Sequence, residues 1–168
     1  EAYYEKGITL VAAAGNGDAY TPTPFEALPG SLPFVTAVAA SDTSGKWWNL
    51  SNFGYVDFVL PGVDIMTTGP HWVLENGRED TVDVYQAENW YTRSTGTSFA
   101  SPMLVGVSAL MKMARPDLVT ATMYDLVAET AGPTADLVQP GFAKIGWGLV
   151  NASAAVGRAT YGLDCDSV

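Results

Sequence analysis

The sequence contains very few residues of the two kinds that most often build metal and redox sites. Its 168 residues include one cysteine, Cys165, and one histidine, His71. A single cysteine excludes a disulfide within the chain and a zinc site built from cysteines, and leaves Cys165 as a spare thiol or a bridge to another chain. His71 lies in the turn-rich polar segment TTGPHWVLENG, where an ordinary surface histidine is the simplest interpretation.

Basic residues are also scarce, which bears on the kinds of partner that the chain can bind. Lys and Arg number 8 against 18 Asp and Glu, for a net charge of -10. Nucleic-acid binding, which needs clustered Lys and Arg, is therefore disfavoured. No apolar run reaches the length of a membrane span. The acidic balance suits a secreted, salt-tolerant or cation-binding protein, and a solvated acidic surface is the preferred interpretation.

The pattern along the chain predicts one α/β domain over residues 1–168 with a largely parallel sheet. The length suits one domain, and a hydrophobic content of 48% is too high for a disordered chain. Continuous apolar runs predict strands buried on both faces, and apolar residues at helical spacing predict helices. Strands are expected in 8–14 and 34–42, and two more in 55–68. Helices are expected over 1–6, from about Thr97, from Pro116 and over 149–159. A surface hairpin is expected as an insertion at 69–93, and a strand or tight loop in 141–148.

The stretch STGTSFASPMLVGVSALM, residues 94–111, places small and hydroxyl residues at the start of an apolar helix. A buried helix explains the apolar part, but it does not explain Gly96 or the small residues around Ser98. The first N–H groups of a helix are free, and they form its positive end. A serine placed there could attack a carbonyl while its own N–H binds the resulting oxyanion. Gly96 would leave room for a substrate backbone, and Pro102 is tolerated early in a helix.

A second polar residue, Asn16, follows the apolar run 8–14 in the sequence AAAGNG. In open α/β sheets, ligand sites gather at the carboxyl ends of the strands. A carboxamide there can donate a hydrogen bond to an oxyanion and carries no charge of its own. We therefore expect Ser98 and Asn16 to converge in space, although they are 82 positions apart in the sequence.

These motifs occur together with further blocks in a familiar order. The blocks are GITLVAAAGN, LPFVTAVAASD, LSNFG, VDFVLPGVDIMTT, STGTSFASPMLVGVSALM and GWGLVNASAAV. In this order they resemble the C-terminal half of the catalytic domain of subtilisin-like serine peptidases, the subtilase family. The resemblance implies that Ser98 is the nucleophile and that Asn16 is the oxyanion-hole amide. It also implies a substrate-binding role for Ala13, Ala14 and Gly15 in one wall of the specificity pocket, for Ala27, Leu28, Pro29 and Gly30 at its far rim, and for Thr97.

The same resemblance implies that part of the catalytic machinery lies elsewhere. The family carries its catalytic Asp and His upstream of the strand that ends in AAGN, so a partner segment carrying both is expected, as a separate chain or a truncated part. Because an unassisted hydroxyl is a weak nucleophile, this chain alone should be nearly inert. By resemblance, the substrate is a peptide or protein, no cofactor is required, and the protein is secreted.

Other interpretations remain open at the level of sequence. The chain could be a pseudo-peptidase, or a binding or scaffold module that keeps the fold without activity. An unrelated α/β protein with a chance Gly-Thr-Ser is a more remote alternative. The resemblance also implies a possible site for a structural calcium or monovalent cation, formed by Asp57 with main-chain oxygens near Gly30, Leu32 and Val35, because some family members use such a site. Calcium usually takes six to eight oxygen ligands, so an ordinary surface role for Asp57 is preferred.

Overall fold

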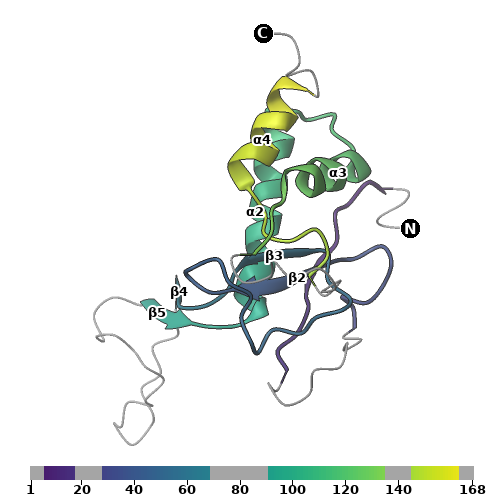
Figure 1. Cartoon of the computed structure of the whole chain (residues 1–168). Coiled ribbons are helices and arrows are strands. Elements are labelled where there is room, and N and C mark those ends of the chain that lie inside the picture. The colour runs from purple at the N-terminus through teal and green to yellow at the C-terminus, as the bar shows by residue number, and fades with distance from the viewer. Residues whose placement is uncertain (1–5, 18–27, 69–90, 135–144, 163–168) are drawn as a thin grey trace, which may run out of the picture.

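A computed structural model describes residues 6–17, 28–68, 91–134 and 145–162 of the chain. Figure 1 shows an α/β arrangement in which one long helix crosses a small sheet, and at its far end it packs against a shorter helix that in turn packs against another. The predicted fold class is thereby confirmed. The elements are β1 (Val11–Ala13), β2 (Thr36–Ser41), β3 (Phe58–Pro61), β4 (Ile65–Thr68), β5 (Tyr91–Ser94), α2 (Thr97–Ala114), α3 (Thr120–Thr130) and α4 (Ala152–Tyr161).

The main sheet has the order β1-β2-β3, and its strands are parallel, as the apolar runs predict. Side chains alternate between its two faces, because successive residues of a strand point in opposite directions. Val38 and Phe58 belong to the large core cluster that includes α2, whereas Ala39 and Val59 belong to a second cluster with Ile145. Both faces of the sheet are therefore covered, which explains why the strand sequences are continuously apolar.

Strands β4 and β5 form a separate antiparallel ribbon that lies apart from the main sheet in Figure 1. Its register pairs Ile65 with Ser94 and Thr68 with Tyr91. The ribbon therefore includes the second strand predicted in 55–68 and the last residues of the predicted insertion. Residues 69–90, which make up most of that insertion, lie outside the described part of the chain, so its surface position stays a prediction.

The described helices match the sequence patterns except at the starts of α3 and α4. Helix α2 begins at Thr97, as predicted, but α3 begins at Thr120 and the prediction that Pro116 starts it was wrong. The reason is a turn in which the Leu118 N–H donates to the carbonyl of Arg115 at 3.1 Å. This turn inserts Leu118 into the core, where its side chain is 3% exposed.

The last helix, α4, begins at Ala152 because the side chain of Asn151 caps it, accepting a hydrogen bond from the Ala154 N–H at 3.0 Å. The two residues before the cap, which we expected to be helical, instead pair with backbone of β3 and of residue 132. Of the predicted strand or tight loop at 141–148, the described part, 145–148, forms a turn. Residues 1–5 of the predicted first helix lie outside the described residues.

Candidate active site

The carboxyl end of β1 and the first residue of α2 meet directly, although they are far apart in sequence. The Gly15 N–H donates to Thr97 Oγ1 at 3.1 Å, and the Thr97 N–H donates to Asn16 Oδ1 at 2.9 Å. Thr97 Oγ1 also donates to Asn16 Oδ1 at 3.0 Å. The structure therefore places Asn16 beside the residue that precedes Ser98, as the sequence motifs predicted.

These bonds fix the orientation of the Asn16 amide. Both donors on Thr97 point at Oδ1, so the opposite atom, Nδ2, faces away from Thr97 with its two N–H groups. Nδ2 lies close to Gly96, where an added Cβ would come within 3.3 Å of it. A side chain at position 96 would therefore have to displace the amide by a few tenths of an ångström, at a backbone φ of 159° that residues other than glycine rarely adopt. The amide end that can donate lies next to the start of α2.

Thr97 itself is fully buried, with 0% of its surface exposed. Its hydroxyl accepts from Gly15 and donates to Asn16, so its hydrogen-bonding capacity is largely used inside the protein. The resemblance suggested a substrate-binding role for this residue. In the structure its visible role is to hold Asn16 and the end of β1 in place, and a contact with substrate stays a prediction.

Ser98 lies at the second position of α2, and it is exposed at the surface. A helix leaves its first four N–H groups without partners inside the helix, and the N–H of Ser98 is one of them. The first turn contains no acidic residue, and its N-cap, Gly96, supplies no side-chain cap. The positive end of the helix is therefore available to a negative charge that forms beside Ser98.

A loop predicted between β2 and β3 holds the backbone next to Asn16, a role that the sequence interpretation missed. Asn52 Nδ2 donates to the carbonyl of Ala14 at 3.0 Å, and the Asn52 N–H donates to the carbonyl of Gly15 at 2.9 Å. Gly17 packs so closely that an added Cβ would lie 2.6 Å from Asn52 Oδ1. The block LSNFG carried the signal for this loop, but a role for its asparagine requires the three-dimensional contact.

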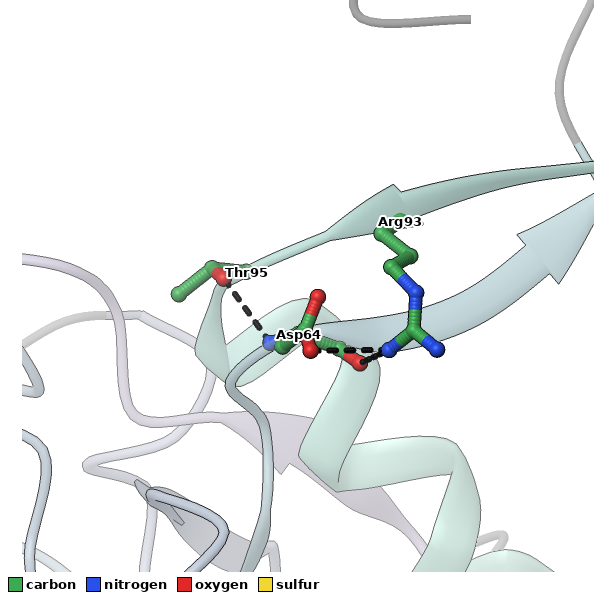
Figure 2. A network of polar contacts seen from close by, with 3 residues as sticks. All are labelled: Asp64, Arg93 and Thr95. Atoms are coloured by element: carbon green, nitrogen blue, oxygen red, sulfur yellow. Dashed lines mark hydrogen bonds and ion pairs between the residues drawn. The ribbon is translucent and has the colours of Figure 1, made fainter. Parts of the chain in front are cut away.

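The β4–β5 ribbon is fastened at the end that leads into α2, as Figure 2 shows. Arg93 Nη1 donates to the backbone carbonyl of Asp64 at 3.1 Å and to its Oδ2 at 2.8 Å. The Asp64 N–H donates to Thr95 Oγ1 at 3.0 Å, and the Gly96 N–H donates to the carbonyl of Gly62 at 2.8 Å. These bonds hold the two residues that immediately precede Thr97, and thereby fix the entry into the helix.

The residues predicted to line the specificity pocket lie in different environments. Ala14 is buried at the end of β1, and Ala13 and Gly15 are partly exposed. Of the far rim, Leu28 and Pro29 are exposed and Gly30 is buried. Ala27 lies outside the described residues. The roles of these residues in binding substrate stay predictions.

Asp57 joins three elements of the fold. Its Oδ2 accepts from the Ala37 N–H at 2.7 Å, and its Oδ1 accepts from the Tyr124 hydroxyl at 2.7 Å. Trp147 Nε1 donates to the same hydroxyl at 3.0 Å. Partial burial and the neighbouring carboxylate raise the pKa of Tyr124 to about 12.

These contacts bear on the predicted cation at Asp57. Both of its carboxylate oxygens are already engaged by protein donors, so the residue has a structural explanation that needs no ion. Within the described residues, no group of three or more His, Cys, Asp or Glu is placed to hold a metal ion. A calcium ion there would have to draw almost all of its six to eight oxygens from main chain and water, and the donor set fits such an ion poorly.

His71 and Cys165, the chain's single histidine and cysteine, both lie outside the described residues. The residues of 6–17, 28–68, 91–134 and 145–162 thus include no histidine that could accept a proton from Ser98. In the same ranges, no helix combines the length and the apolar character needed to cross a membrane.

Comparison with known proteins agrees with this geometry. The profile described as the subtilase family matches residues 2–148. A probable subtilase-type serine protease of Deinococcus radiodurans is 32% identical over 157 residues, covering 92% of this chain and 21% of that protein. An extracellular protease of Xanthomonas campestris pv. campestris is 36% identical over 159 residues, covering 94% of this chain and 25% of that protein.

Subtilisin DY of Bacillus licheniformis is 29% identical over 153 residues, covering 90% of this chain and 48% of that protein. Among solved structures, the prenylagaramide maturation protease PagA superposes with a TM-score of 0.70 at 27% identity, covering 94% of this chain and 52% of that one. The chain thus spans about half or less of the length of these relatives. The matching profile, the relatives and the shared fold agree that the chain belongs to the subtilase family.

Proposed function

We propose that this chain supplies the nucleophile and the oxyanion-binding groups of a subtilisin-like serine endopeptidase. Ser98 is the nucleophile, and Asn16 Nδ2 and the Ser98 N–H are the two donors. The observation that carries the proposal is the pair of hydrogen bonds from Thr97 to Asn16 Oδ1, because they leave Nδ2, which lies close to Gly96, as the end of the amide that can donate. The named relatives, all described as proteases, support the reaction class.

In this mechanism, Ser98 Oγ attacks the carbonyl carbon of the scissile peptide bond. A histidine takes the proton from the hydroxyl, and an aspartate orients that histidine. The carbonyl oxygen becomes negative and is held by Asn16 Nδ2 and the Ser98 N–H, near the positive end of α2. The histidine then gives its proton to the leaving amine, an acyl group stays on Ser98 Oγ, and water releases it by the reverse sequence of proton transfers.

The histidine and aspartate of this mechanism belong to an upstream segment of the subtilase domain, either as a preceding part of the same polypeptide or as a separate chain. The chemistry needs no cofactor. We also propose that the protein is secreted, since its relatives include an extracellular protease and its own net charge is -10. Its substrate is a peptide or protein whose backbone lies beside Gly96 and Ser98.

A fluorophosphonate probe tests the nucleophile. In this reaction Ser98 Oγ would attack phosphorus and displace fluoride, so that the labelled residue can be mapped by mass spectrometry. The parent protein, meaning the complete product of the gene that encodes this chain together with any chain that stays bound to it, is expected to be labelled at Ser98. The 168-residue chain alone is expected to react very little. Ser98→Ala should abolish labelling, whereas Ser101→Ala in the same helical turn should not.

The oxyanion role of Asn16 has a sharper test in Asn16→Asp. This change keeps Oδ1, the acceptor for both Thr97 bonds, and replaces the donating Nδ2 by oxygen. The variant should fold like the wild type and lose labelling by about 100-fold, the low end of the range known from removing such a donor in subtilisin itself. A parent protein that folds but is not labelled at Ser98 would support a non-catalytic scaffold instead.

A further inference from the structure

Asn16 is followed by Gly17, the residue next to which an asparagine side chain is chemically least durable. The main-chain nitrogen after an asparagine can attack the side-chain carbon Cγ, and glycine hinders this attack least because it has no Cβ. Both Asn16 and Gly17 are exposed, so water and base can reach them. The residue that the proposed mechanism uses as an oxyanion donor therefore lies in a sequence that favours its own conversion to aspartate.

The packing around Gly17 explains why the chain carries glycine at this position. A Cβ added there would lie 2.6 Å from Asn52 Oδ1, well inside van der Waals contact. Asn52 is buried, with 8% of its surface exposed, and it donates hydrogen bonds to the carbonyls of Ala14 and Gly15. A side chain at position 17 would have to displace Asn52 and weaken these bonds. The fit at the end of β1 thus favours the residue that leaves Asn16 most reactive.

The loop at residues 50–52 also holds the two reacting groups apart. The Gly17 N–H donates to the carbonyl of Leu50 at 2.7 Å, and Asn16 pairs with Ser51 in an antiparallel bridge. Ser51 is buried, and its Oγ accepts from a main-chain N–H of β2 at 3.0 Å, which ties the loop to the sheet. The Gly17 nitrogen must lose its proton and turn toward Cγ before it can attack. It can do so only after its bond to Leu50 opens.

We propose that Asn16 is a deamidation site whose rate of conversion is set by its pairing with the 50–52 loop. The Gly17 nitrogen loses its proton and bonds to Cγ of Asn16, and Nδ2 leaves as ammonia. The product of this step is a succinimide ring. Water then opens the ring at either of its carbonyls and gives aspartate or isoaspartate. The net reaction consumes one water and releases one ammonia, and it needs no oxidant or other reactant.

Both products lack the donor on which the proposed mechanism relies. A carboxylate has only acceptors, and it brings a negative charge to the place where the substrate oxygen becomes negative. Isoaspartate also adds a methylene to the main chain, which breaks the register of Gly17 with the 50–52 loop. The loss of reactivity at Ser98 rests on the proposed function, whereas the deamidation itself does not. The stability of this loop thereby sets how long the site stays active.

Isotope incorporation at residue 16 tests the site without relying on activity. The parent protein, carrying Ser98→Ala to prevent self-cleavage, is incubated at mildly alkaline pH in water enriched in a heavy oxygen isotope, in buffer and in urea. Deamidation adds one oxygen from water at residue 16, and mass spectrometry of the peptide that contains this residue measures it. We expect the folded protein to convert about 100-fold more slowly than the protein in urea, because the pairing must open first.

A matched pair of substitutions tests the role of the loop. Asn52→Ala removes the bond donated to the Ala14 carbonyl at 3.0 Å, and Thr120→Val removes a bond donated to the Gly7 carbonyl at 2.7 Å, away from the loop. Asn52→Ala should raise the conversion rate of the folded protein about 10-fold, the effect expected of one lost hydrogen bond. Thr120→Val should leave that rate at the wild-type level, because the opening is local. Adding Gly17→Ala to Asn52→Ala should slow the conversion again, since the new Cβ hinders the attacking nitrogen and no longer meets Asn52 Oδ1.

The outcomes separate this inference from the proposed function. Equal conversion rates in buffer and in urea, equal rates for Asn52→Ala and the wild type, or an Asn16 that is unchanged even in urea would each overturn the inference. In an aged parent protein with Ser98 intact, a biotinylated fluorophosphonate should capture the molecules that keep Asn16 and miss those that carry aspartate or isoaspartate. Conversion at Asn16 in a protein that is never labelled at Ser98, or that is labelled equally in both forms, supports the inference and overturns the proposed function.

Discussion

The hydroxyl of Thr97 offers the most specific test of how the site is held together. Thr97→Val keeps the shape of the side chain but removes one bond donated to Asn16 Oδ1 and one accepted from the Gly15 N–H. Each bond contributes about 1 kcal/mol, and an N–H left unpaired in the interior adds a penalty of about 1–3 kcal/mol. The free energy of unfolding should therefore fall by about 3–5 kcal/mol.

The same substitution should affect reactivity through Asn16. With Thr97→Val, the Asn16 amide keeps only the backbone N–H of residue 97 as its anchor. The amide can then rotate, and we expect fluorophosphonate labelling of Ser98 in the parent protein to slow by about 10-fold, equivalent to about 1.4 kcal/mol. Urea unfolding followed by tryptophan fluorescence measures the stability, and the time course of labelling measures the reactivity.

Thr120→Val is the matched control for this experiment. Thr120 is also a buried threonine at the first position of a helix, and its hydroxyl donates to the carbonyl of Gly7 at 2.7 Å, away from the site. It should cost about 1 kcal/mol of stability and leave the labelling rate unchanged. Equal labelling of the Thr97→Val protein and the wild type would refute the claim that this hydroxyl positions Asn16.

Three further predictions concern the surroundings of the site. Gly62→Ala would place a Cβ 2.6 Å from that of Ala40, and the free energy of unfolding in urea should fall by about 1–3 kcal/mol. A fall of less than about 0.5 kcal/mol would contradict the close packing at Gly62. Arg93→Met should lower stability by only about 0.5 kcal/mol, because this ion pair with Asp64 is about half exposed, yet it should raise the proteolysis rate of the ribbon. Tyr124→Phe should flatten the pH dependence of stability at alkaline pH. In the wild type, the pKa of Tyr124 is raised to about 12, so its contribution to the free energy of unfolding is complete below about pH 10 and is lost as pH rises through 12. Alkaline unfolding curves that are identical for both proteins would contradict this role.

The sequence was sufficient to locate the elements that are buried on one or both sides. Strand β2 was predicted as a buried strand from its apolar run, and β3 as a short strand before Pro61-Gly62. In the structure, both faces of these strands are covered. The start of α2 at Thr97 was predicted from the change from small hydroxyl residues to apolar ones. Such elements can be predicted from sequence because a buried segment has an apolar composition along its own length.

Features that depend on contacts between distant segments could not be read in this way. Pro116 is a good first residue for a helix, but burial of Leu118 in the core delays α3 until Thr120. The partner of β4 is β5, from the far side of the predicted insertion. The role of Asn52 depends on bonds to the carbonyls at the end of β1, which local sequence does not encode.

The convergence of Asn16 and Ser98 lies between these two cases. The motifs predicted that both residues belong at the carboxyl edge of the sheet, and the structure bonds Asn16 to Thr97, the residue before Ser98. That the two side chains meet at one point stays a prediction. The orientation of the Asn16 amide, by contrast, was not predictable from sequence. It follows from two donors on one residue that both point at the same oxygen, and this is a property of the folded chain.

The most direct measurement is a crystal structure of the parent protein with a phosphonate covalently attached to Ser98 Oγ. The phosphonyl oxygen would stand where the carbonyl oxygen of a substrate becomes negative. The proposed chemistry predicts that this oxygen lies about 3 Å from both Asn16 Nδ2 and the Ser98 N–H. An adduct whose oxygen points away from Asn16, or an Asn16 amide that has turned Nδ2 toward Thr97, would contradict it.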